Sequence, residues 1–402
     1  MSVKKLKKAK KRDHTKEVLA TVTESEAPRS QADGAKKTDP KYEKLPLYFY
    51  ILMGVALLAL LLYLVAVLSP AFANWFNGGI GAGIRAFLAY LTSWLPFSLA
   101  EFLIYLSPAI VIALGIYAYR WRCETWRSVF VFLGCVISVF SIFFSLFVFG
   151  FGTGYHTDPL DQRLALNAGE VSGTELYETA LWLTREVNQS AGDIDFGENG
   201  FSVMPHSRRE MNDLLIAAYR PVCDAYPFIQ RLNSRVKPVL ASHLMSYTHI
   251  TGVYTYFTGE ANLNTAFPDY TLPFTAAHEL AHQRGIAREN EANFVAFLVT
   301  AASEDPYIRY SGYLNLFEYV SSALYEVSPE QYKEILGKLD KKVIGELRAY
   351  SAFFDTYRNA AIADVSEVFN DTHLKFHGSA AGVDSYGLVV DLAVAYYQTN
   401  KG

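Results

Sequence analysis

Residues 273–298 read PFTAAHELAHQRGIARENEANFVAFL, and His278, Glu279 and His282 form the pattern His-Glu-x-x-His within them. Residues four apart lie on one face of a helix, so the pattern predicts that both imidazoles bind the same metal ion. Gly285 is placed where a helix commonly ends. Neutral histidine nitrogens suit zinc, and we therefore expect a single zinc ion at this helix.

Glu279 follows the first histidine on the same helical turn. From that position its carboxylate is expected to act as a general base, taking a proton from the water that attacks a substrate. The alternative is an ordinary helix with two surface histidines. The small or apolar neighbours Ala276, Ala277, Leu280 and Ala281 argue against it, because a buried helix does not ordinarily carry unpaired polar side chains.

A third ligand is needed, because catalytic zinc usually has three protein ligands. Glu289 and Glu291 both fall in the first turn of the next expected helix and point about 200° apart. We favour Glu289, with Glu291 as the alternative. The other glutamate would be a charge favoured by the helix dipole. Asn293, one turn after Glu289, is a candidate to hydrogen-bond a ligand.

The motif HELAH, followed by a helix that opens with E-x-x-A, resembles the zincin metallopeptidases, in the branch whose third ligand is glutamate. Membrane members of that branch carry E-x-x-A-D, and Glu289 to Asn293 is similar, with Asn293 in place of the aspartate. The metzincin branch is disfavoured, since Arg288 stands where its third histidine would be. The resemblance implies a zinc-dependent peptidase with a zincin-like fold.

The segment TGEANLN, residues 258–264, precedes the motif and is rich in strand-forming neighbours. We expect it to be an edge strand beside the metal, with Glu260, Asn262 and Asn264 projecting to one side toward a bound substrate. The alternative is a polar hairpin turn without a role in substrate binding.

Near the C-terminus, Tyr386 lies at the expected start of a helix. Hydrolysis of a peptide bond requires a donor for the oxyanion, and a tyrosine hydroxyl is suitable. Tyr386 is our candidate for this catalytic role. A partly buried tyrosine with a satisfied hydroxyl is the alternative.

Three stretches before residue 152 are long and apolar enough to cross a bilayer. They cover approximately residues 45–68, 97–119 and 129–151. Between the first two lies a glycine-rich stretch containing Arg85, which is expected to lie flat in the membrane interface. The sequence therefore predicts a membrane domain over residues 45–152.

Residues 1–44 begin with a run of lysines and continue with small polar residues, which predicts a disordered basic tail. The tail and the arginine-rich loop after the second span belong on the cytoplasmic side, by the positive-inside rule. Three spans then place residues 153–402 outside the cytoplasm. The chain's net charge of −4 gives no general attraction to nucleic acid.

The order of segments over nearly the whole chain resembles a bacterial membrane family described only as a domain of unknown function. The matching segments are three spans, TGEANLN, PFTAAHELAHQRGIARENEANF and GVDSYGLVVDL. This resemblance implies a zincin-like fold and a bacterial plasma membrane, and implies no particular substrate.

We therefore expect a mainly α membrane protein: three transmembrane helices, then a mostly helical, zincin-like α+β domain over residues 153–402. The expected function is hydrolysis of a peptide or protein substrate outside the cytoplasm, by metal-activated water with Glu279 as general base. The alternative is a membrane sensor or scaffold of zincin-like fold whose metal is structural or regulatory. The lipid bilayer is an expected partner, nucleic acid is not, and the oligomeric state stays open.

Overall fold

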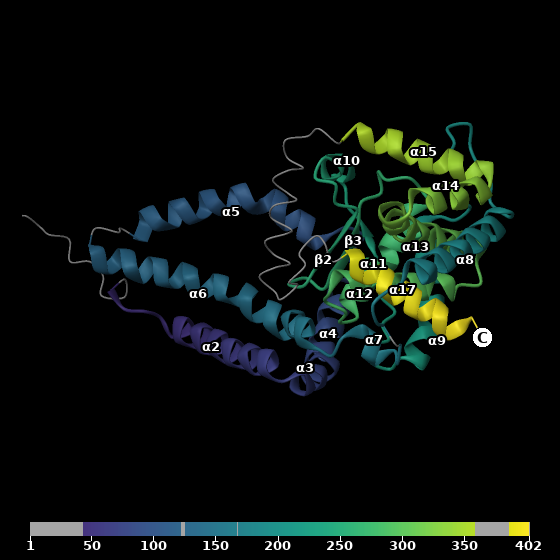
Figure 1. Cartoon of the computed structure of the whole chain (residues 1–402). Coiled ribbons are helices and arrows are strands. Elements are labelled where there is room, and N and C mark those ends of the chain that lie inside the picture. The colour runs from purple at the N-terminus through teal and green to yellow at the C-terminus, as the bar shows by residue number, and fades with distance from the viewer. Residues whose placement is uncertain (1–42, 122–124, 167, 358–385, 402) are drawn as a thin grey trace, which may run out of the picture.

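The computed structural model describes residues 43–121, 125–166, 168–357 and 386–401, and Figure 1 shows that helices dominate it. The expected basic tail lies outside the described residues up to residue 42. The membrane part has the elements α2 (Leu47–Leu68), α3 (Pro70–Phe76), a π-helical turn (Asn77–Gly81), α4 (Ala82–Thr92), α5 (Leu99–Trp121) and α6 (Trp126–Gly150).

The remaining elements form the C-terminal domain. They are a 3₁₀ turn (Gly152–His156), α7 (Leu160–Arg163), α8 (Gly173–Ala191), α9 (Arg208–Ala225), β1 (Lys237–Pro238), α10 (Ser242–Ser246), β2 (Gly252–Thr255), β3 (Glu260–Leu263), α11 (Thr271–Gln283), α12 (Glu289–Ala301), α13 (Pro306–Val327), α14 (Pro329–Lys338), α15 (Lys341–Asp355) and α17 (Tyr386–Asn400).

Three helices, α2, α5 and α6, are long and apolar enough to cross a membrane. Their bounds agree with the expected spans to within three residues, so those spans are confirmed. Most of their large apolar side chains are exposed in the protein, which is the pattern of helices that are solvated by lipid. In Figure 1, α2 and α6 lie side by side and α5 stands apart from them.

The C-terminal domain lies at one end of these three helices (Figure 1). The chain reaches this end when α2 finishes at Leu68, leaves it when α5 begins at Leu99, and returns when α6 finishes at Gly150. The connecting residues 70–92 fold into short helices that pack against the domain. Arg85 is 1% exposed, whereas Phe87, Tyr90 and Leu91 of the same helix are exposed, so the expected position of this stretch in the interface stays a prediction.

The helix α11 lies at the centre of the C-terminal domain, in contact with α12, α13 and the sheet. It can occupy this position because its small residues, Ala276, Ala277 and Ala281, are fully buried and let neighbouring elements approach closely. Outside this centre, α8 packs on α13, and α17 packs on α12 and α13.

Sequence signals fix the starts of the two outer helices α8 and α9. Each begins after a serine with a glutamate three residues later, Ser172 with Glu175 and Ser207 with Glu210. In both pairs the serine side chain accepts from the glutamate N–H, and the glutamate carboxylate accepts from the serine N–H. Two unsatisfied backbone donors are thereby paired at each helix start.

The sheet has three strands in the order β1-β3-β2. Strands β2 and β3 form an antiparallel hairpin, with Val253 opposite Asn262, whereas β1 runs parallel to β3. This order corrects one expectation. Residues 260–263 form the central strand of the sheet rather than an edge, β2 is an outer strand, and α11 packs against both β2 and β3.

Candidate metal centre

Three side chains from two helices converge on one point. The Nε2 atoms of His278 and His282 on α11 lie 3.0 Å apart. The carboxylate of Glu289 on α12 lies 3.1 Å from His278 Nε2 and 3.4 Å from His282 Nε2. A tetrahedral ion with bonds of about 2.0–2.1 Å separates its ligand atoms by about 3.3 Å. The donor set of two nitrogens and one carboxylate therefore fits zinc in both chemistry and spacing.

The end of α11 fixes the orientation of His282. The residue after the helix C-cap, Gly285, has φ +96°, which a glycine adopts without strain. The Gly285 N–H donates to His282 O, and the Ile286 N–H donates to Ala281 O, the two hydrogen bonds of a Schellman motif. The sequence expectation that the helix ends at Gly285 is confirmed.

This turn brings the carbonyl of Ile286 to 2.8 Å from His282 Nδ1. A carbonyl oxygen only accepts, so Nδ1 must carry the hydrogen of the neutral ring. The lone pair of His282 is then on Nε2 and points at His278 and Glu289. Such a hydrogen bond to the remote nitrogen is the usual support of a metal-binding histidine.

Electrostatics at the convergence point favour a cation. Burial would lower the pKa of His282, but the charge and hydrogen bond of Glu289 outweigh it and raise that pKa to about 9. Burial likewise would raise the pKa of Glu289, yet both histidines hold it well below its usual value. The site thus attracts positive charge strongly, and a divalent ion can supply that charge in place of a proton.

Glu291 points elsewhere. Its carboxylate accepts from Arg288 Nη1 at 2.6 Å and from the Leu160 N–H at 3.0 Å. Its side chain is 4% exposed, against 32% for that of Glu289. Of the two candidates for third ligand, the structure brings Glu289 to the histidines. Glu291 instead forms an ion pair with Arg288 at the start of α12 and a hydrogen bond with the backbone of α7.

Glu279 lies beside the convergence point with one carboxylate oxygen, Oε2, buried and without a hydrogen-bond partner. Its carboxylate accepts from the backbone N–H of Tyr254 in β2. Burial raises the pKa of Glu279 to about 7, against the opposing charges of His278 and His282. The arrangement leaves one oxygen of this carboxylate available for a proton.

Among the residues that the structure describes, no strand pairs with the outer edge of β2, and Gly252 on this strand lies against Glu279. Asn264 N donates to Thr251 O, and hydrogen-bonded pairs alternate along an antiparallel ladder. Gly252 and Tyr254 therefore direct their N–H and C=O groups away from β3. A Cβ at Gly252 would lie 2.5 Å from Glu279 Oε1, so only glycine lets the carboxylate approach this closely.

Sequence reasoning missed this pair, Gly252 and Tyr254, as part of the site. The available signal was a glycine at the start of a strand, which often marks close approach of another group. Without the fold, Gly252 indicates only a boundary between extended segments.

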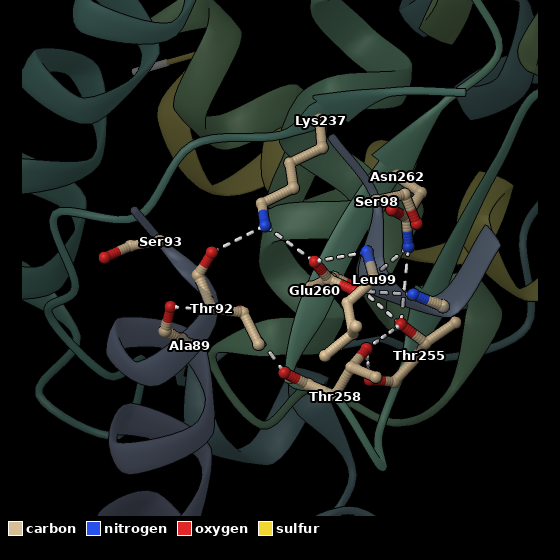
Figure 2. Close-up of polar contacts among 12 residues, drawn as sticks. Ala89, Thr92, Ser93, Ser98, Leu99, Lys237, Thr255, Thr258, Glu260 and Asn262 are labelled. Carbon is tan, nitrogen blue, oxygen red and sulfur yellow. Dashed lines mark hydrogen bonds and ion pairs between the residues drawn. The ribbon is translucent and has the colours of Figure 1, made fainter. Parts of the chain in front are cut away.

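The polar side chains of β3 point into the fold. Glu260 is fully buried and accepts from the Leu99 and Ala100 N–H groups at 3.0 Å each and from Lys237 Nζ at 2.6 Å. Figure 2 shows it between Lys237 and the start of α5, where it caps a membrane helix. The expectation that Glu260 faces a substrate is therefore corrected.

The two asparagines of this segment are also engaged within the domain. Asn262 Nδ2 donates to the carbonyl oxygens of Val253 and Glu260, and Asn264 Nδ2 donates to Ser246 Oγ. Both residues are almost completely buried. They connect the hairpin to itself and to α10, which corrects the expectation that they contact a substrate.

The two remaining candidates are placed only in part. Asn293 is buried on the same face of α12 as Glu289, one turn further on. Tyr386 is the first residue of α17, as expected, and its side chain lies outside the described part of the chain. The roles of both residues stay predictions.

A buried arginine connects the metal helix to the membrane helices. Arg85 donates to Asn77 Oδ1, to Asn77 O and to Gly150 O, at 2.8, 2.8 and 3.0 Å. Asn77 Nδ2 in turn donates to Gly285 O at 2.9 Å. The guanidinium thus lies near the carboxyl ends of α6 and α11, where a positive charge is favoured by both helix dipoles.

Comparison with known proteins gives one match. The model of a family described as "Protein of unknown function (DUF3810)" matches residues 76–394, most of the chain. No curated protein and no solved structure matches. The matched range includes α5, α6, the sheet and the whole candidate metal centre.

Proposed function

This chain belongs to the family described as "Protein of unknown function (DUF3810)", and we propose that it is a membrane-anchored, zinc-dependent peptidase. One observation carries the proposal. The nitrogens of His278 and His282 and the carboxylate of Glu289 converge at zinc-ligand spacing, and the unpartnered carboxylate oxygen of Glu279 lies beside them. A purely structural site needs no such carboxylate, and it is more often closed by four protein ligands.

Each residue of the site has a separate role in the proposed hydrolysis. His278, His282 and Glu289 would hold zinc, which when bound supplies a Lewis acid that activates water and polarises a carbonyl. Glu279 takes one proton from the attacking water at Oε2 as the new C–O bond forms. It then delivers this proton to the amide nitrogen as the C–N bond breaks. The second proton of the water passes from the new carboxylic acid to the amine, so the products are a carboxylate and an ammonium group.

Two further parts of the chain would orient the substrate. Among the described residues no strand pairs with the outer edge of β2, where the backbone groups of Gly252 and the carbonyl of Tyr254 can pair with a peptide beside Glu279. The hydroxyl of Tyr386 is proposed to donate to the oxyanion that forms during attack. The backbone edge fixes where the peptide lies, and the tyrosine stabilises the charge that develops.

Zinc removal tests the proposal. We expect the purified full chain, in detergent or lipid discs, to contain one zinc and to cleave members of a random peptide library. Dialysis against a chelator should abolish cleavage, and zinc should restore it, because the Lewis acid is lost and regained. Zinc analysis and mass spectrometry of the products are the measurements. A protein with one zinc that cleaves nothing would favour a sensor or scaffold with a regulatory metal.

The domain is proposed to act outside the cytoplasm of a bacterial cell, across the plasma membrane from the basic tail. Arg120 and Arg127 mark the end of the spans opposite the domain, and the positive-inside rule assigns that end to the cytoplasm. The expected topology is a cytoplasmic N-terminus and an exported domain.

Reporter fusions check this topology. A phosphatase that is active only outside the cytoplasm, fused after Gly402, should be active, and the same reporter inserted after Trp121 should be inactive. A fluorescent protein that matures only in the cytoplasm provides the matched control at both positions. Fluorescence from the Gly402 fusion, with phosphatase activity at the loop position, would reverse the orientation.

A further inference from the structure

A row of aromatic pairs holds strand β2 and the turn that follows it against the membrane helix α6. The ring of Tyr254 packs on Phe151, Tyr256 on Phe147, and Phe257 on Phe143, with centroids 5.4, 5.3 and 5.4 Å apart. The three phenylalanines are four residues apart and so occupy one face of α6 and its end. From Tyr254 to Phe257 the chain moves away from the metal centre, and the residue of α6 that it contacts changes from Phe151, after the end of the helix, to Phe143, further inside the helix.

The turn between β2 and β3 therefore lies beside the membrane-spanning part of α6. Phe143 lies seven residues before Gly150, the last residue of the third membrane-spanning helix. At 1.5 Å per residue, the contact with Phe257 is about 10 Å inside that end. The side chain of Phe257 is partly exposed. Its exposed part lies at a depth where α6 is surrounded by lipid.

The other end of β2 is at the metal centre, which itself adjoins the end of α6. Phe151, the residue after α6, has its ring 5.7 Å from the ring of His282. Gly252, the first residue of β2, touches the Glu279 carboxylate. One short strand therefore leads from the reacting groups to the bilayer, and no strand in the described part of the chain pairs with its outer edge.

We propose that the substrate is a peptide segment that directly adjoins a membrane anchor, paired with the free edge of β2 and with one end in the bilayer. This inference rests on the proposed peptidase function and adds the class of substrate to it. β2 has four residues and spans about 13 Å, so the bond that reaches Glu279 lies within about five residues of the anchor.

The test compares three peptides that share one cleavable sequence, with the full chain reconstituted in lipid vesicles. One is soluble, one is joined to an apolar membrane helix by three residues, and one is joined to it by twenty residues. Both anchored peptides are equally concentrated at the membrane, so the comparison isolates the distance from the anchor. We expect kcat/KM for the short spacer to exceed that for the long spacer about ten-fold.

A variant of the turn gives the matched control. Phe257→Asp should bring the ratio of kcat/KM for the short spacer to kcat/KM for the long spacer close to one, because a charge at position 257 is disfavoured within the bilayer. Tyr325→Asp changes an exposed aromatic on α13 in the same way and should leave all three rates unchanged. Equal kcat/KM for both spacers in the wild type would overturn the inference while leaving the peptidase function standing.

A second measurement does not depend on activity. A fluorophore attached to a cysteine at position 257, with the native cysteines replaced, should be quenched by lipids that carry a quencher on their acyl chains. The same label at Val203, an exposed residue before α9, should not be quenched. Absence of quenching at 257 would overturn the inference, and failure to cleave any of the three peptides would overturn both it and the peptidase function.

Discussion

Replacing Glu279 with glutamine is expected to lower the rate of peptide hydrolysis by about three orders of magnitude while the protein keeps its zinc. Glutamine has nearly the same shape, so it fits against Gly252, and its carbonyl oxygen can still accept from the Tyr254 N–H. It cannot take up a proton from water or deliver one to the leaving amine. The change therefore removes the proton transfer alone.

The measurement is kcat with a cleavable peptide, alongside zinc content and melting temperature of the same preparation. His278→Ala serves as the contrast, because it should lose zinc and activity together. If Glu279→Gln retains wild-type kcat, Glu279 is not the general base, and the proposed mechanism is wrong at its central step.

Replacing Glu289 with glutamine is expected to weaken zinc binding more than about 100-fold. Loss of a group that merely supports a ligand costs 10–100-fold, and Glu289 is placed as a ligand itself. The pair Glu289→Gln and Glu291→Gln makes the same chemical change two residues apart, which controls for the effect of charge on α12. Glu291→Gln should keep zinc affinity close to that of the wild type.

Glu291→Gln should affect stability instead, since its carboxylate pairs with Arg288 and the Leu160 N–H. We expect the free energy of unfolding to fall by about 2 kcal/mol, the usual worth of a hydrogen bond to a charged group. Competition with a zinc-binding dye gives the affinity, and thermal melting gives the stability. Zinc loss in Glu291→Gln with full affinity in Glu289→Gln would exchange the two assignments.

The convergence of the three candidate metal ligands could be predicted because their geometry is local. His278 and His282 share a face of one helix, and Glu289 follows a turn that Gly285 makes short, so helical periodicity alone nearly determines their convergence. The membrane spans were predictable for a similar reason, since length and apolar composition suffice to identify them.

The surroundings of the metal centre depend on contacts between distant segments, which periodicity does not encode. Alternation in residues 258–264 indicated a strand, but nothing local indicated that β1 would pair with its other side. Glu260 therefore seemed free to meet a substrate, although it caps α5 more than 150 residues earlier in the chain. The place of Gly252 against Glu279 likewise arises only when the hairpin packs on α11.

The contacts of Arg85 join the candidate metal centre to the membrane helices. Through Asn77 it connects the carbonyl of Gly285, three residues after His282 of the candidate metal centre, to the carbonyl of Gly150 at the end of the third span. The anchor is thus part of the same folded unit as the centre, and it differs from a passive tether that could be exchanged for another. Shedding the domain by a cut after Gly150 would break this unit. The proposed peptidase would therefore reach only substrates in the patch of membrane around it.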